Sequence, residues 1–109
     1  MHDAEKDRLA TSVADRHTEF ERALRGNRRK YAIHEFRLFA EAVRRYVGNA
    51  EGDETVHRRV VRAVYGLGEG LRLERKAPPI DVLVEAERLE CLVFLGYDPY
   101  FEGDEPPGL

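Results

Sequence analysis

The stretch RRKYAIHEFRLFAEAVRRYV, residues 28–47, decides the fold, because apolar and charged residues separate on it at helical spacing. At about 100° per residue, its apolar side chains cover an arc of roughly 220° and its charged side chains cover the opposite side. The apolar arc holds Tyr31, Ala32, Ile33, Phe36, Leu38, Phe39, Ala40, Ala42, Val43, Tyr46 and Val47. An arc that wide has to be covered from more than one side, so the stretch predicts a helix within an all-α bundle.

Apolar spacing and helix-stop residues predict three more helices. The first runs from about residue 3 to residue 24 and stops at Gly26-Asn27. The third covers roughly residues 54–76, with Asp53 or Thr55 as its N-cap and Pro78-Pro79 after its end. The fourth covers residues 80–95 and stops at Gly96. Because short loops join antiparallel neighbours, we expect a four-helix up-and-down bundle over residues 1–96.

Two segments leave the element assignment open. Glycines at positions 66, 68 and 70 favour a notch for close packing within a continuous third helix, with a helix break as the alternative. A phosphate-binding loop does not fit, since such a loop leads from a strand into a helix and these glycines follow a helical pattern. The run IDVLV, residues 80–84, alternates like a strand, but the length of the segment and its glutamates favour a helix.

Length and composition indicate one small domain. The chain has 109 residues, a net charge of −3 and a single cysteine, which excludes an internal disulfide and a zinc site built on several thiolates. No apolar run is long enough to cross a membrane, and the first residues lack the pattern of a signal peptide. We therefore expect a cytoplasmic protein that does not interact with membranes.

Charge is distributed unevenly along the chain. Residues 21–50 carry eight bases and three acids, whereas residues 77–109 carry one base and eight acids. The basic segments could bind a partner of opposite charge or pair with the acidic third of the same chain. The latter is the favoured interpretation, and it includes a non-helical acidic and aromatic tail, residues 97–109, that packs on the bundle or on a sister subunit.

A basic helix face is the candidate binding site for the alternative function. It would use Lys30, His34, Arg37 and Arg44 of the second helix, extended by Arg58, Arg59 and Arg62 if the third helix is a neighbour. These residues would make the chain a nucleic-acid-binding or RNA-processing bundle. Arg28 or Arg29 followed by His34 matches the Arg-x4–6-His spacing of some helical RNases, but about 120° to 140° of helix rotation separates the side chains.

Three polar residues fall within apolar arcs. His17 and Glu35 lie near the same end of an antiparallel pair of helices, so we expect them to form a buried hydrogen-bonded pair. His57 lies on the apolar side of the third helix. A bundle that binds a metal or a small ligand around His17 and Glu35 is a further alternative, although only one Glu-x-x-His motif, Glu54 to His57, is present.

The segment 80–95 is apolar on two sides, with Glu85 on one and Glu87 on the other. A single chain of this size also has to cover the wide apolar arc of residues 28–47, so we expect a second copy or another protein to cover part of 80–95. Cys91 lies on this segment and reads as a small apolar residue without an activating base. The sequence thus predicts a non-enzymatic association module, most simply a homodimer through residues 80–95, with no catalytic residue, metal or cofactor.

Overall fold

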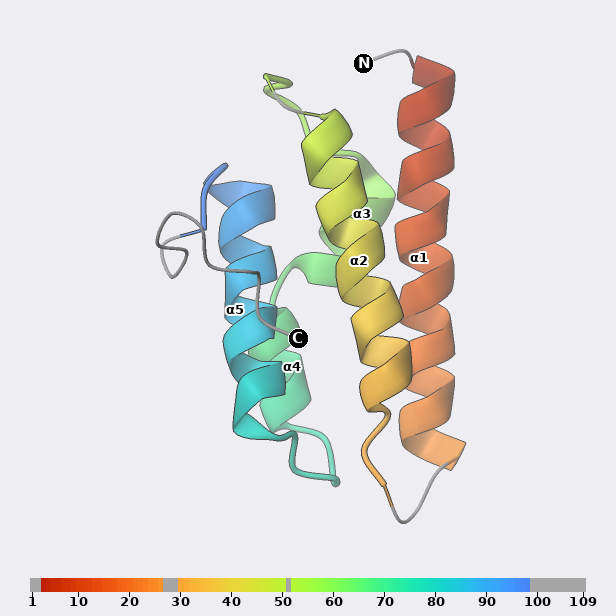
Figure 1. The fold of residues 1–109 in the computed structure, drawn as a ribbon, viewed down its shortest axis with the longest axis vertical. Coiled ribbons are helices and arrows are strands. Elements are labelled where there is room, and N and C mark those ends of the chain that lie inside the picture. The colour runs from red at the N-terminus through yellow and green to blue at the C-terminus, as the bar shows by residue number, and fades with distance from the viewer. Residues whose placement is uncertain (1–2, 27–29, 51, 99–109) are drawn as a thin grey trace.

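The computed structural model describes residues 3–26, 30–50 and 52–98, and these form helices and loops without a strand. Five helices are present in that part of the chain: α1 (Asp3–Gly26), α2 (Ile33–Asn49), α3 (Arg58–Val64), α4 (Leu67–Arg72) and α5 (Ile80–Phe94). Figure 1 shows α1, α2 and α5 as long, roughly parallel or antiparallel columns, with α3 and α4 forming a fourth column behind them. The prediction of an all-α bundle is confirmed.

The long helices follow the apolar spacing, and their ends follow local chemistry. The predicted bounds of α1 and α5 are confirmed to within two residues. At the end of α5, Gly96 takes a positive φ of 81°, a conformation that favours glycine. Helix α2 begins later than predicted because Ala32 has a ψ of 60°, which is not helical, although its side chain is buried.

The predicted third helix is two helices, so the expectation of one continuous helix over residues 54–76 is wrong. Tyr65 is extended and Gly66 has a positive φ of 69°, which breaks the helix between α3 and α4. The break turns the chain without the steric cost that a side chain at position 66 would add. The predicted caps are also wrong, since His57 is the N-cap of α3 and its side chain accepts a hydrogen bond from the amide of Arg59.

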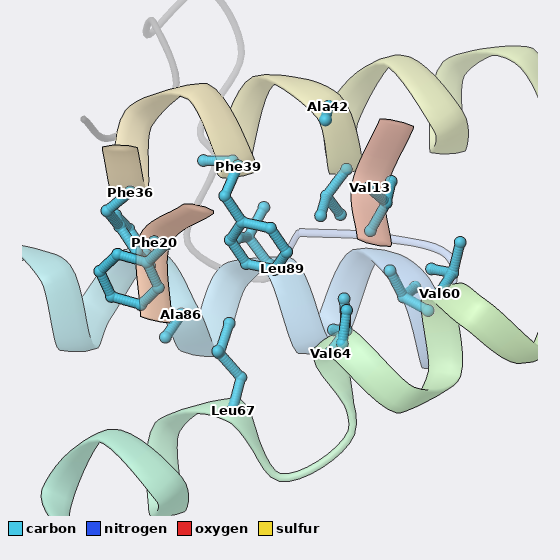
Figure 2. Packing of buried hydrophobic residues seen from close by; sticks show 14 of the residues in the cluster. Val13, Phe20, Phe36, Phe39, Ala42, Val60, Val64, Leu67, Ala86 and Leu89 are labelled. Carbon is cyan, nitrogen blue, oxygen red and sulfur yellow. The ribbon is translucent and has the colours of Figure 1, made fainter. Parts of the chain in front are cut away.

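The core lies where the four columns meet. Helices α1 and α5 both pack against α2 and against α3, so α2 lies across the core from α3. Figure 2 shows Phe36 and Phe39 of α2 on one side of the core and Leu67 of α4 on the other, with Leu89 of α5 between them. Phe20 of α1 completes an aromatic cluster, with ring centroids 5.2 Å from Phe36. Each of these buried side chains contributes about 1.5–3 kcal/mol to stability.

Candidate functional site

An exposed apolar stripe runs along α5. The exposed large apolar side chains of the described residues are Tyr65, Leu73, Ile80, Val84, Phe94, Leu95 and Tyr97, four of which lie on α5 or at its C-cap. At helical angles, Ile80, Val84, Cys91, Phe94 and Leu95 fall within an arc of about 100°. We call these five residues the α5 stripe. Exposed apolar side chains grouped on one surface mark an interaction site more often than single exposed apolar residues do.

The opposite side of α5 is covered by the chain itself. Val82, Ala86 and Leu89 are fully buried, and Val93 is buried at the same face. Both sides of this helix were predicted to be apolar. The described residues cover the side that holds Val82, Ala86 and Leu89, and they leave the α5 stripe exposed. The tail residues 99–109, which we expected to pack on the bundle or on a sister subunit, lie outside the described residues.

A charged pair interrupts the α5 stripe at its middle. Glu87 lies between Val84 and Cys91, and its carboxylate accepts a hydrogen bond of 3.0 Å from the guanidinium of Arg72 at the end of α4. Both side chains are more than a third exposed. The stripe therefore has apolar residues towards both ends and one acid beside one base at its centre.

The buried side of α5 carries a chain of charges that the sequence did not reveal. Glu85 has no exposed surface and forms an ion pair with Arg44 of α2. Arg88 is 7% exposed, and its Nε donates to a carboxylate oxygen of Asp98 at 2.7 Å. Burial raises the pKa of the Glu85 carboxyl, and the hydrogen bond and charge of Arg44 offset this in part.

The contact with Glu85 explains the position of Arg44, one of the predicted basic residues. Arg44 was expected on the charged outer row of α2, but it reaches inward to Glu85 and its side chain is 23% exposed. A charge from the basic segment thus pairs with a carboxylate of the acidic third of the chain. Arg44 is consequently not available to a partner in the way that the alternative function required.

The remaining predicted basic residues lie on two separate faces. Lys30, His34 and Arg37 are exposed on or just before α2, and Arg58, Arg59 and Arg62 are exposed on α3. Because α2 and α3 lie across the core from one another, their outer surfaces point in different directions. The two groups do not form the single patch that neighbouring helices would have produced. Whether either group binds a ligand stays a prediction.

His17 and Glu35 do not form the predicted pair, which is a correction. The Nδ1 of His17 lies 3.3 Å from Glu21 on the same helix, and its ring lies 5.3 Å from the ring of Phe39. Burial lowers the pKa of His17, and the charge of Glu21 opposes this effect. Because Glu21 is one helical turn from His17 on the same helix, this contact does not depend on how two helices align, and it is favoured over a contact with Glu35.

His57 joins three parts of the bundle. Its backbone amide donates to the hydroxyl of Tyr46 at 2.9 Å, and its Nδ1 accepts from the Arg59 amide at 3.2 Å. Since an accepting Nδ1 carries no proton, Nε2 is the nitrogen that donates to Asp7, at 2.8 Å. His57 is thus a capping residue with satisfied hydrogen bonds, not a core residue on an apolar face.

The described part of the chain offers little for metal or thiol chemistry. It contains no group of three or more His, Cys, Asp or Glu residues that could hold a metal ion. Burial and the neighbouring carboxylates, first among them Glu90, raise the pKa of the Cys91 thiol. A raised pKa disfavours the thiolate, which is the reactive form.

Comparisons with known proteins do not add a function. Searches against models of protein families, curated proteins and solved structures give no match. Among the described residues, no helix is long and apolar enough to cross a membrane. The features that bear on function are therefore the α5 stripe, the buried charges and the basic faces of the chain itself.

Proposed function

We propose that the protein is a cytoplasmic, non-enzymatic association module that forms a homodimer through the α5 stripe. The observation that carries this proposal is the exposure of apolar residues towards both ends of the α5 stripe, with Ile80 at 75%, Val84 at 39%, Phe94 at 40% and Leu95 at 61%. Burying such residues against another surface is favourable by about 25 cal/mol for each Å² of apolar area removed from water. The single cysteine favours a reducing compartment.

A second copy fits this surface because the stripe is self-complementary. In a two-fold dimer with antiparallel α5 helices, Ile80 faces Leu95 of the other copy and Val84 faces Cys91. The two-fold axis then passes next to Glu87, near the middle of the helix. Each Glu87 approaches the Arg72 of the other copy, so the charged pairs attract across the axis.

The expected dimer is weak. Helix α5 has 15 residues and is about 22 Å long, so one helix pair covers less than the roughly 1,200–2,000 Å² of a stable interface. We therefore expect monomer and dimer to exchange, with a dissociation constant on the order of 1–100 μM. Sedimentation equilibrium over a range of protein concentrations measures this constant directly.

The first test places a charge in the stripe. Val84→Glu should leave the protein monomeric at every concentration, because dimerisation would bury an unpaired carboxylate. His34→Glu, on the exposed outer face of α2, is the matched control and should dimerise like the wild type. Far-UV circular dichroism checks that both variants are folded. A wild-type protein that stays monomeric, or a Val84→Glu dimer, contradicts the proposal.

The second test addresses the orientation of the two helices. Arg72→Glu alone should weaken the dimer, since it brings like charges together next to the axis, and so should Glu87→Arg alone. The double variant Arg72→Glu with Glu87→Arg restores opposite charges and should recover dimerisation. If the double variant is as weak as the single variants, the antiparallel arrangement is wrong.

A further inference from the structure

A shallow groove follows the seam between α1 and α3. One depression, of about 490 Å³, is lined by Asp7, His57, Arg58, Arg59 and Arg62. A second, of about 400 Å³, is lined by Ala14, His17, Thr18, Arg59, Arg62 and Ala63. Because Arg59 and Arg62 line both depressions, the two adjoin, and we call them together the α1–α3 groove.

Positive charge dominates the α1–α3 groove. Three arginines face one acid, Asp7, which already accepts a hydrogen bond from the ring of His57. Within the described residues, none of the three guanidinium groups forms an ion pair with a carboxylate. The groove is therefore a local site of positive potential on a chain with a negative net charge.

The spacing of the arginines suits a chain of phosphates. Arg58 and Arg62 are one helical turn apart, and Arg59 and Arg62 are three residues apart, so their Cβ atoms lie about 5–6 Å from one another. The guanidinium of Arg59 donates to the hydroxyl of Thr11 on α1, which positions it over the seam. Guanidinium groups bind phosphate oxygens through two parallel hydrogen bonds.

An exposed aromatic ring, that of Tyr65, lies at one end of the row of arginines. Tyr65 is 77% exposed and lines a depression that Arg62 and His17 also line, so it continues the seam beyond the α1–α3 groove. Its ring packs against the ring of Phe94 in a T-shaped arrangement, with centroids 5.9 Å apart and planes at 88°. A ring fixed in this way can stack on a nucleobase, which is the second contact that single-stranded nucleic acids need.

We propose that the α1–α3 groove binds a single-stranded nucleic acid, with Arg58, Arg59 and Arg62 contacting phosphates and Tyr65 stacking on a base. A duplex is a poorer fit, because its bases are already stacked and cannot reach Tyr65. This site is separate from Lys30, His34 and Arg37, because the outer surface of α2 points in another direction. The three arginines are independent of the proposed dimer, since no residue of the groove belongs to the α5 stripe, whereas Tyr65 contacts Phe94 of the stripe.

Fluorescence anisotropy with a fluorescein-labelled oligouridylate measures this binding. At low salt the oligonucleotide should bind, and the affinity should fall as salt rises because phosphate contacts release counterions. The triple variant Arg58→Ala, Arg59→Ala and Arg62→Ala should lose at least about tenfold in affinity, and its salt slope should decrease by about 2, at about 0.7 per phosphate contact. Lys substitutions at the same positions should retain part of the binding.

Two controls separate the groove from charge in general. The triple variant Arg25→Ala, Arg45→Ala and Arg75→Ala removes the same charge from exposed positions outside the groove and should bind like the wild type. Tyr65→Ala should weaken oligouridylate binding without changing the binding of inorganic polyphosphate, which has no base to stack. Thermal unfolding confirms that each variant is folded.

Several outcomes would overturn the proposal. No binding at low salt, or equal losses in the two triple variants, would mean that the groove is not a specific site. Tighter binding of duplex RNA than of the single strand would exclude the role of Tyr65. Binding of polyphosphate together with an unchanged affinity of Tyr65→Ala for oligouridylate would assign the groove to phosphate polymers in general.

Discussion

Each side of α5 holds residues of a kind that is usually found on the other side of a helix. The side packed against the bundle holds two charged residues, Glu85 and Arg88, whereas the outer side holds the apolar α5 stripe. Each side has a physical requirement that the helix cannot meet alone. A buried charge needs a partner of opposite charge, which Arg44 and Asp98 supply. An exposed apolar surface needs a second surface to cover it, and we propose a second copy.

The largest expected effect comes from removing a partner on the buried side. Arg44→Leu leaves the Glu85 carboxylate buried without its nearest cation and should lower the free energy of unfolding by about 3 kcal/mol. Urea titration followed by far-UV circular dichroism measures the loss. The exposed neighbour gives the matched control, since Arg45→Leu should change stability by less than about 0.5 kcal/mol.

The double variant sharpens this test. Arg44→Leu combined with Glu85→Leu removes both charges, so it should recover most of the stability that Arg44→Leu loses. The loss in Arg44→Leu should also shrink at acidic pH, because a protonated Glu85 needs no cation. If the double variant is less stable than Arg44→Leu, the interaction between the two residues is not the reason for the loss.

A smaller difference in stability is expected between a Val→Ala substitution on the buried side of α5 and one on its exposed side. Val82 is fully buried, and Val84, two residues later, is 39% exposed. Val82→Ala should cost about 2 kcal/mol, because it removes buried apolar groups and leaves a cavity. Val84→Ala should cost less than about 0.5 kcal/mol when unfolding is measured on dilute, monomeric protein. At high protein concentration the cost of Val84→Ala should rise, since the dimer interface is then populated. Equal costs at low concentration would mean that both sides are covered within one chain.

The smallest effect concerns His17, a partly buried titratable group whose charged partner is Glu21. The folded-state pKa of His17 lies below its ordinary value of 6.5, mainly because of burial. The unfolded chain therefore binds more protons between the two pKa values, so the free energy of unfolding falls as the pH drops below about 6.5. His17→Gln should remove this part of the pH dependence.

Urea titrations of both proteins at several pH values isolate the contribution of His17. Its neighbours are Glu21 on α1 and Arg62 across the seam, and both stay in place in the variant. The wild type should lose more stability than His17→Gln on going from neutral to mildly acidic pH. A larger loss in the variant would mean that the effect of Glu21 exceeds that of burial.

The sequence predicted the elements best where apolar spacing and helix-stop residues agree. The bounds of α5 are nearly right because Pro78-Pro79 and Gly96 enclose a run of apolar residues. The sequence could not distinguish a helix break at Gly66 from a notch for close packing, because the glycines at positions 66, 68 and 70 look alike in sequence. The backbone angle that distinguishes Gly66 depends on how α3 and α4 dock against α1 and α5.

The sites were less predictable, because they depend on contacts between helices. Helical angles place Arg44 among the outer charges, and only the position of Glu85 on another helix turns it inward. The partner of His17 could have been found, since Glu21 stands four residues later on the same helix. The stripe on α5 was visible because a helix with two apolar sides indicates an uncovered surface whatever its neighbours are.

The break at Gly66 also determines how the fourth column of the bundle forms. Helices α3 and α4 have seven and six residues, which is below the roughly 12–15 residues that an isolated helix needs. Neither half can persist on its own, so the column acquires its helical structure only as it docks on α1 and α5. Its amides should therefore exchange with solvent hydrogen earlier than those of α1, through opening events that leave the other three columns in place.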